Sequence, residues 1–192
     1  MKIAVIGAGL AGTLICNELA ENHEVTLLEI GQKDAIFYPQ LFFPGKQLAG
    51  VKTFCFGGGG TTNLWHNGLI PIQQQDVVSQ TFKTVLSEAE PFHDKAAEKL
   101  YWLDHPYSET YRKVCAKTTA LAENLGCFPE GVDCLLYPKQ FSRLEVDPAV
   151  QEIYSVSSVD FIMNSSRIVS LECISGSVLH SIPVDCVVLN AG

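Results

Sequence analysis

Basic side chains are scarce in this chain of 192 residues, and long apolar runs are absent. Lys and Arg number 13 against 21 Asp and Glu, which gives a formal charge of −8, and they are scattered along the sequence. Nucleic acids and anionic membranes are bound through clustered Lys and Arg, and a membrane helix needs roughly 18 apolar residues in a row. Neither feature occurs, so we expect no nucleic-acid partner and no membrane partner.

Several signatures of catalysis and metal binding are also missing. The seven cysteines include no Cys-x-x-Cys pair, and the histidines show no spacing of the His-x-x-x-His kind. Neither a Gly-x-Ser-x-Gly elbow nor a phosphate-loop lysine is present. We therefore predict no metal site, a cytoplasmic location, and cysteines of which most are small, buried hydrophobic residues.

What the sequence does contain is a pattern of strand, turn, helix and strand in its first thirty residues. A parallel strand buried on both faces has a continuous apolar run, and residues 3–6 and 25–28 form two such runs. Between them, apolar residues recur at helical spacing from Leu10 to Leu19. This order predicts an α/β fold of the Rossmann-like, doubly wound type.

The turn after the first strand contains the pattern Gly-x-Gly-x-x-Gly. Such glycines permit a tight turn, a close approach of the backbone to a pyrophosphate, and packing of the helix on the sheet. Glu29 ends the second strand, where its carboxylate can accept hydrogen bonds from both ribose hydroxyls and repel a 2′-phosphate. We predict that the ADP half of a dinucleotide contacts Gly7, Ala8, Gly9, Leu10, Ala11, Gly12 and Glu29.

A second glycine-rich loop indicates that the predicted cofactor is FAD and not NAD. Four consecutive glycines, residues 57–60, are followed by two threonines, which suits a backbone wrapped around more phosphate or ribitol. A flexible linker is the alternative, but the apolar Leu64, Leu69 and Ile70 argue against it. The predicted FAD contacts in this loop are Gly59, Gly60, Thr61, Thr62, Asn63 and Trp65.

Together these motifs resemble the glucose–methanol–choline oxidoreductases, especially their bacterial, pyranose-oxidase-like branch. Residues 168–192 are similar to the antiparallel meander and returning parallel strand of such FAD domains. The resemblance implies an FAD-dependent oxidoreductase that oxidises an alcohol or sugar hydroxyl by passing a hydride from the carbon that bears it to flavin N5. It also implies that Ile168 offers backbone groups to adenine and that Ala191 and Gly192 approach the pyrophosphate.

Two departures from this family affect the prediction. Where the family has its flavin-linking histidine, immediately before the tryptophan, this chain has Leu64, and His66 follows Trp65 in the wrong register. We therefore predict non-covalent FAD. The family's substrate domain and catalytic pair lie beyond the position of Gly192, so no catalytic residue is assigned. We expect an N-terminal portion whose substrate domain comes from further sequence or a partner chain, or else a short remnant.

The predicted organisation has three parts. Residues 1–71 form the first part of the FAD-binding domain, residues 72–137 a helical insertion, and residues 138–192 the second part. In the insertion we expect a helix capped by Asp76, one over 96–103, and one over 108–125 with an apolar packing stripe. Other functions remain open: an amine oxidase-like or mutase-like flavoenzyme, a non-catalytic nucleotide-binding subunit, or an NAD-dependent dehydrogenase, which leaves the second loop unexplained.

Overall fold

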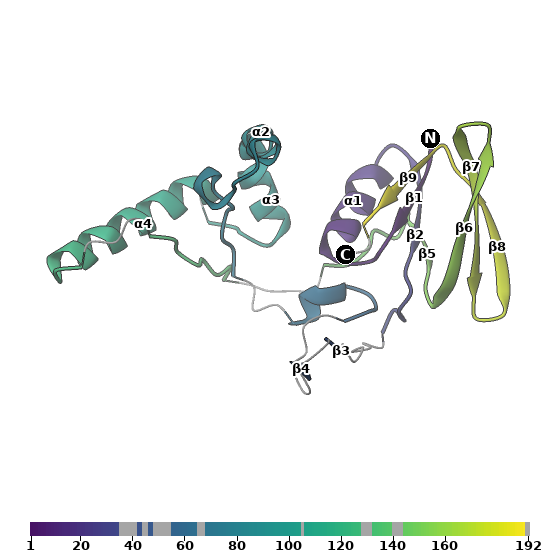
Figure 1. The fold of residues 1–192 in the computed structure, drawn as a ribbon, viewed down its shortest axis with the longest axis horizontal. Helices are drawn as coiled ribbons and strands as arrows, with labels where there is room; N and C mark the ends of the chain where they lie inside the picture. Colours follow the sequence, from purple (N-terminus) through teal and green to yellow (C-terminus); the bar gives the residue numbers. More distant parts are fainter. Residues whose placement is uncertain are drawn as a thin grey trace. The chain divides into compact units, whose positions relative to one another are not determined.

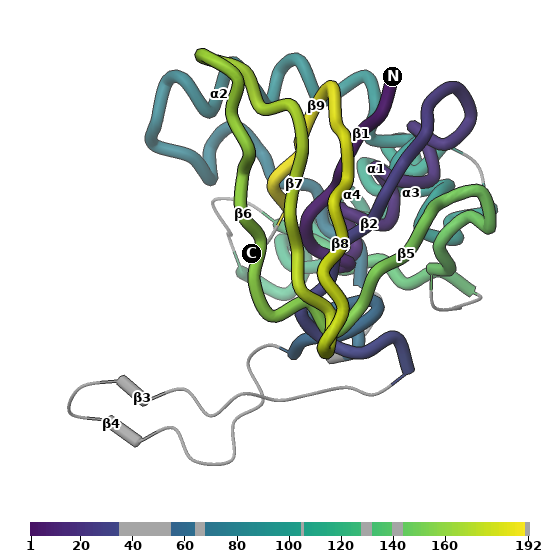
Figure 2. Tube along the Cα trace, turned by 90° about the vertical axis from the view of Figure 1, so that its right-hand side faces the viewer, coloured from purple at the N-terminus to yellow at the C-terminus, as the bar shows by residue number. Residues whose placement is uncertain are grey.

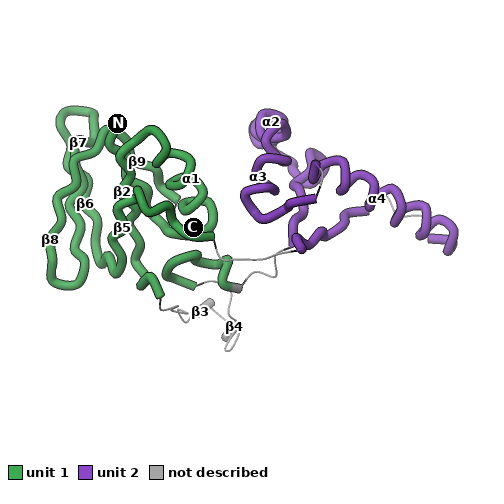
Figure 3. Tube along the Cα trace, turned by 180° about the vertical axis from the view of Figure 1, so that it is seen from behind, with its two compact units in different colours: residues 1–65, 143–192 green, residues 66–142 purple. Residues whose placement is uncertain are grey.

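The computed structural model describes residues 1–34, 55–64, 68–104, 106–127, 132–139 and 144–190, together with the backbone of 42–43 and 46–47. The chain divides into two compact units. Unit 1 comprises Met1–Trp65 and Arg143–Gly192, and unit 2 comprises His66–Ser142 (Figure 3).

Unit 1 is built on a four-stranded parallel sheet in the order β5-β2-β1-β9. Its strands are β1 (Lys2–Ile6), β2 (Glu24–Leu28), β5 (Gln151–Ile153) and β9 (Cys186–Leu189), and α1 (Leu10–Ala20) joins the first two. The expected strand, turn, helix and strand are therefore present, and the chain's end returns beside β1 as predicted.

The sheet is covered on both faces, which explains the continuous apolar runs in its strands. On one face Val5 and Leu27 pack in a cluster with Cys16 of α1. On the other face Ala4 and Leu28 pack in a second cluster. Because each central strand buries side chains in both directions, alternation of polar and apolar residues is lost.

The second face is covered by an antiparallel meander (Figures 1 and 2). Its strands β6 (Val156–Asn164), β7 (Arg167–Ser175) and β8 (Val178–Pro183) lie in sequence order, with β7 in the centre. Leu171 and Ile182 point from the meander into the core beside Ala4. The predicted fold class, an α/β Rossmann-like sheet with a meander and a helical insertion, is confirmed.

Unit 2 contains the helices of the chain's middle. They are the 3-10 turn η2 (Gln74–Asp76), α2 (Gln80–Ala89), the 3-10 turn η3 (Glu90–Phe92), α3 (His93–Lys99) and α4 (Tyr107–Asn124). The remaining short elements are η1 (Gly60–Leu64) in unit 1 and the antiparallel strand pair β3 (Phe42–Phe43) and β4 (Lys46–Gln47).

The prediction that Asp76 caps the first of these helices is wrong. Asp76 closes a capping box with Gln73 around η2, and α2 begins after Ser79, whose side chain accepts a hydrogen bond from the Phe82 amide. Both residues are good N-caps, so the sequence offered two start points. Val78 lies between the two start points, before the helix, and is fully exposed.

Two packing predictions also fail in part. The apolar stripe of α4 packs only at its start, since Tyr111 is buried while Leu121 and Leu125 are 60% and 73% exposed. Of the seven cysteines, which were mostly expected in the core, three are buried, two are half-buried and two are exposed.

Within the described part of the chain, no helix has the length and apolar character needed to cross a membrane. In the same residues, His, Cys, Asp and Glu side chains nowhere gather in a group of three that could hold a metal ion.

Candidate dinucleotide site

The turn between β1 and α1 has the geometry that its glycines make possible. Gly7 adopts a φ of 108°, in the region that favours glycine, and its amide donates to the Leu28 carbonyl at 2.8 Å. A Cβ on Gly12 would lie 1.9 Å from the Gly7 carbonyl oxygen, so only glycine lets α1 pack on the turn. A Cβ on Gly9 would meet no atom within 4 Å, because this residue faces open space.

The N-terminus of α1 offers unpaired amides to that open space. Gly9 is the N-cap residue and supplies no side chain, and the first α-helical bond runs from the Thr13 amide to the Gly9 carbonyl at 2.9 Å. The amides of residues 10–12 precede this bond and have no intrahelical acceptor. No acidic side chain occupies the first turn, so the positive end of the helix dipole is available to an anion.

Glu29 joins three segments of the site. Its side chain is buried, and Oε2 accepts a hydrogen bond from the Ala8 amide at 2.8 Å. Oε1 accepts from the amides of Gly31 at 2.8 Å and Gly57 at 3.0 Å. A carboxylate has roughly four acceptor positions, and these three amides use all but about one of them. Glu29 can therefore accept a hydrogen bond from about one ribose hydroxyl, whereas the sequence predicted bonds from both.

The second glycine loop lies directly on the first turn. Gly59 forms a parallel bridge with Gly9, and its amide donates to the Ala8 carbonyl at 2.8 Å. A Cβ on Gly60 would come within 3.0 Å of the Gly9 Cα, and both Gly57 and Gly60 have positive φ. The loop therefore needs glycine for its own conformation and for the closeness of the two segments.

Asn63 holds this loop together from within. Its Nδ2 donates to the carbonyls of Gly58 at 3.0 Å and Gly60 at 2.8 Å. The buried Cys55 thiol donates to the same Gly60 carbonyl at 2.8 Å. The side-chain amide predicted to contact FAD is thus used to shape the loop.

The two loops, Glu29 and the start of the meander enclose one cavity of about 800 Å³. Ligand pockets typically measure about 300–1,000 Å³. Seven of the predicted residues line it: Gly7, Gly9, Leu10, Glu29, Gly60, Thr61 and Thr62.

Other predicted residues do not reach this cavity. Ala8 is fully buried and bonded on both sides, and Ile168 packs against the core from the central strand β7. The structure also does not bring Ala11, Gly12, Gly59 or Asn63 to the cavity wall. Trp65, Ala191 and Gly192 lie outside the described residues, as does His66.

The wall that sequence reasoning missed comes mainly from β6. Residues 156–159 line the cavity, together with Cys55, Phe56 and Asn190 among others. The chain crosses from the parallel sheet to the meander at Ser155, which has a φ of 56° and whose amide donates to the Gly31 carbonyl at 2.8 Å. The β-branched and aromatic residues after Ser155 could have indicated a strand, but nothing local indicates that it flanks Glu29.

Charge in the cavity is set by one residue. Among the described lining residues Glu29 is the only charged side chain, and no Lys or Arg is present. An anion here would be held by backbone amides and the helix dipole.

Outside the cavity, the core thiol of Cys16 is kept protonated. Burial, and to a smaller extent the charge of Glu152, raises the pKa of the Cys16 thiol to about 12.

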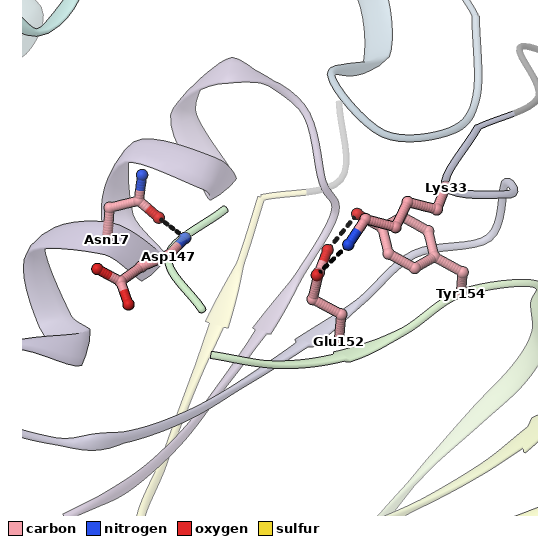
Figure 4. Close-up of polar contacts among 5 residues, drawn as sticks. All are labelled: Asn17, Lys33, Asp147, Glu152 and Tyr154. Atoms are coloured by element: carbon pink, nitrogen blue, oxygen red, sulfur yellow. Dashed lines mark hydrogen bonds and ion pairs between the residues drawn. The ribbon is translucent and has the colours of Figure 1, made fainter. Parts of the chain in front are cut away.

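A set of polar contacts fastens β5 to its neighbours (Figure 4). Glu152 pairs with Lys33 and accepts a hydrogen bond from the Tyr154 hydroxyl at 2.8 Å. The Asn17 side chain of α1 donates to the Glu145 carbonyl at 2.9 Å and accepts from the Asp147 amide at 2.8 Å. These contacts position the segment that leads to Ser155 and the cavity wall.

Fold and site together place the chain in the class of Rossmann-like α/β proteins with a pocket at the turn after the first strand. No family model matches the sequence, and no curated protein matches it either. The structure is similar to that of pyridoxine 4-oxidase from Mesorbium loti, with a TM-score of 0.61 and 15% identity. That match covers 100% of this chain and 49% of the oxidase, so the chain spans about half of that protein's length.

A second solved structure is a more distant match. It is an oxidoreductase from Methanosarcina mazei, with a TM-score of 0.39, 14% identity, and coverage of 100% of this chain and 59% of that one. At these identities the likeness concerns the fold alone.

Proposed function

We propose that this chain is the FAD-binding portion of a flavin-dependent oxidoreductase of the glucose–methanol–choline type, acting on an alcohol or sugar hydroxyl. One observation carries the proposal: the first turn, Glu29 and the second glycine loop line a single cavity. The two glycine motifs are far apart in the sequence, and their meeting at one place supports a common ligand. The likeness of the fold to that of pyridoxine 4-oxidase also supports the proposal of an oxidoreductase.

The residues present fit the ADP half of FAD. The free amides of residues 10–12 would hold the pyrophosphate at the helix N-terminus, and the open space beside Gly9 leaves room for its close approach. The remaining acceptor position of Glu29 would take a ribose hydroxyl. The apolar side chains of Val156 and Val159 would contact the adenine.

The second loop favours FAD over NAD, because it adds Gly60, Thr61 and Thr62 to the wall beyond the first turn. Those backbone and hydroxyl groups would serve the second phosphate and the ribitol. A 2′-phosphate would meet the buried carboxylate of Glu29 without a compensating cation in the described wall, which disfavours NADP.

When bound, the flavin supplies a two-electron acceptor for a hydride from the substrate's carbon. The residues of this chain bind and orient it, and the buried loop contacts of Asn63 and Cys55 keep that part of the wall rigid. We assign no catalytic base to these residues. Since Leu64 stands where the family has its linking histidine, we expect the flavin to be released when the protein is denatured.

The test is a titration of the purified protein with FAD, NAD and NADP, followed by flavin absorbance and by calorimetry. We expect FAD to bind at least tenfold more tightly than NAD or NADP, a difference of about 1.4 kcal/mol. A protein that binds NAD as tightly as FAD, or that binds no nucleotide, would contradict the proposal.

The variant Gly9→Val tests whether FAD binds at the first glycine turn. Gly9 has extended backbone angles, and a Cβ added there meets no atom within 4 Å, so we expect the valine side chain to be tolerated by the fold while it enters the space assigned to the pyrophosphate. We expect FAD affinity to fall at least a hundredfold, about 2.7 kcal/mol, with unfolding unchanged. The control is Ala116→Val, which adds the same kind of side chain at an exposed position of α4 away from the cavity wall and should keep its FAD affinity.

A further inference from the structure

Unit 2 contains a group of thiol and polar side chains that the proposed function does not use. Three of them lie on α4 at Tyr111, Cys115 and Thr118. Residues spaced by three and four positions share one face of a helix, so Cys115 lies between the other two on the same face.

The segment 132–136 runs along this face. The Tyr111 hydroxyl donates to Asp133 Oδ1 at 2.9 Å, and the Cys134 Sγ lies 3.7 Å from the Thr118 Oγ1. Because two neighbouring residues of the segment contact the positions on either side of Cys115, this cysteine faces the same stretch.

The geometry brings the two thiols to the same place. Cys115 lies one helical turn from Thr118, whose hydroxyl lies 3.7 Å from the Cys134 Sγ, and burial first, together with the neighbouring Cys134 thiol, raises the pKa of Cys115. The segment is also fixed by a pair of backbone hydrogen bonds between Leu136 and Leu69, at 2.7 and 3.1 Å. The thiols therefore meet in a framework that holds them together, which is unlike the exposed thiols of Cys127 and Cys186.

We propose that Cys115 and Cys134 form a reversible disulfide by exchange with a small-molecule disulfide such as oxidised glutathione. One thiolate attacks a sulfur of glutathione disulfide, a mixed disulfide forms, and one glutathione thiolate leaves. The second protein thiolate then displaces the other glutathione, and the two protons lost by the cysteines are taken up by the two leaving thiolates. Two protein thiols are oxidised and one small disulfide is reduced.

The second step distinguishes this pair from the other cysteines. A thiol held beside its partner attacks within the molecule, so the mixed disulfide is short-lived. The product closes a loop from Cys115 to Cys134 and ties the segment 132–136 to α4, which restricts opening of this part of unit 2.

The experiment is oxidation of the folded full chain with oxidised glutathione, followed by alkylation of the remaining thiols, digestion without reductant and mass spectrometry. We expect the linked Cys115–Cys134 peptide pair as the main disulfide, and its loss on treatment with dithiothreitol. Persistent glutathione on Cys115 or Cys134, or faster formation of links through the exposed Cys127 or Cys186, would overturn the proposal.

Two variants make the result specific. Cys134→Ser should abolish the link and leave glutathione on Cys115, while Cys127→Ser, which removes an exposed thiol from the region after α4, should leave the yield of the link unchanged. If Cys127→Ser lowered the yield about tenfold, the link would depend on exchange through Cys127 and not on the placement of Cys115 beside Cys134.

Discussion

At the scale of single residues, Glu29 combines assembly with recognition. Its carboxylate accepts hydrogen bonds from the amides of Ala8, Gly31 and Gly57, which belong to three different segments. Buried hydrogen bonds to a charged group contribute about 1.5–3 kcal/mol each. These bonds join the walls of the site to one another, so the side chain holds the site in shape independently of any ligand.

Glu29→Gln tests this role. The glutamine amide group places N–H donors where the carboxylate accepts, so at least one backbone amide loses its partner. We expect the free energy of unfolding without FAD to fall by about 2–4 kcal/mol, measured by urea denaturation. Glu24→Gln, at the exposed start of the same strand, is the control and should change it by less than about 0.5 kcal/mol. Loss of FAD affinity with unchanged stability would show that Glu29 serves the ribose alone.

The local sequence predicts which residues form the turn but not how their polar groups are used. Gly7, Gly12 and Glu29 follow from a pattern within thirty residues, because strand, turn and helix are local structures. The amide of Gly57 reaches Glu29 from a distant part of the chain, and Asn63 turns inward to its own loop. Neither the choice of a distant partner nor the direction in which a side chain turns can be predicted from residue spacing.

At the scale of elements, α4 carries two buried tyrosines that differ in one respect. Tyr107 and Tyr111 are each about 5% exposed. The Tyr111 hydroxyl is bonded to Asp133 at 2.9 Å, whereas the Tyr107 hydroxyl has no hydrogen-bond partner among the described residues. Burial raises the pKa of Tyr107 to about 12, so its hydroxyl stays neutral at ordinary pH.

Replacing each tyrosine by phenylalanine should therefore have opposite results. Tyr107→Phe removes a buried hydroxyl without a partner and is expected to leave stability unchanged or raise it by about 1 kcal/mol. Tyr111→Phe removes the closer of the two donors to Asp133 Oδ1, the other being Gln73 Nε2 at 3.5 Å, and should cost about 1–2 kcal/mol. The check is urea unfolding followed by circular dichroism, and equal losses in the two variants would contradict the assigned hydrogen bonding.

The strands show why element positions are harder to predict than element types. The sequence predicts the meander, but it assigns the cavity contact to Ile168. In the structure Ile168 lies on the central strand β7, and the cavity is lined by residues 156–159 of the edge strand β6. Which strand flanks the site depends on the crossover at Ser155, which no periodicity indicates.

At the scale of the whole molecule, the site belongs to one unit although it is assembled from both ends of the chain. The described lining residues come from residues 6–62 and 156–190, all within unit 1. We propose that unit 1 is the two-part FAD-binding domain and that unit 2 is the helical insertion. Bound FAD would then contact both chain segments of unit 1 and stabilise their association.

A ligand that binds only the folded form stabilises it by mass action. With FAD at about a hundred times its dissociation constant, the gain is about 2.7 kcal/mol. Hydrogen exchange measured by mass spectrometry should show this gain as slower exchange in β1, α1 and the loop 55–64 of unit 1. The amides of α4 in unit 2 should exchange at the same rate with and without FAD, and Gly9→Val should show no protection anywhere. Slower exchange in α4 would instead mean that the ligand also acts on unit 2, so the site could not be confined to the residues that line the cavity.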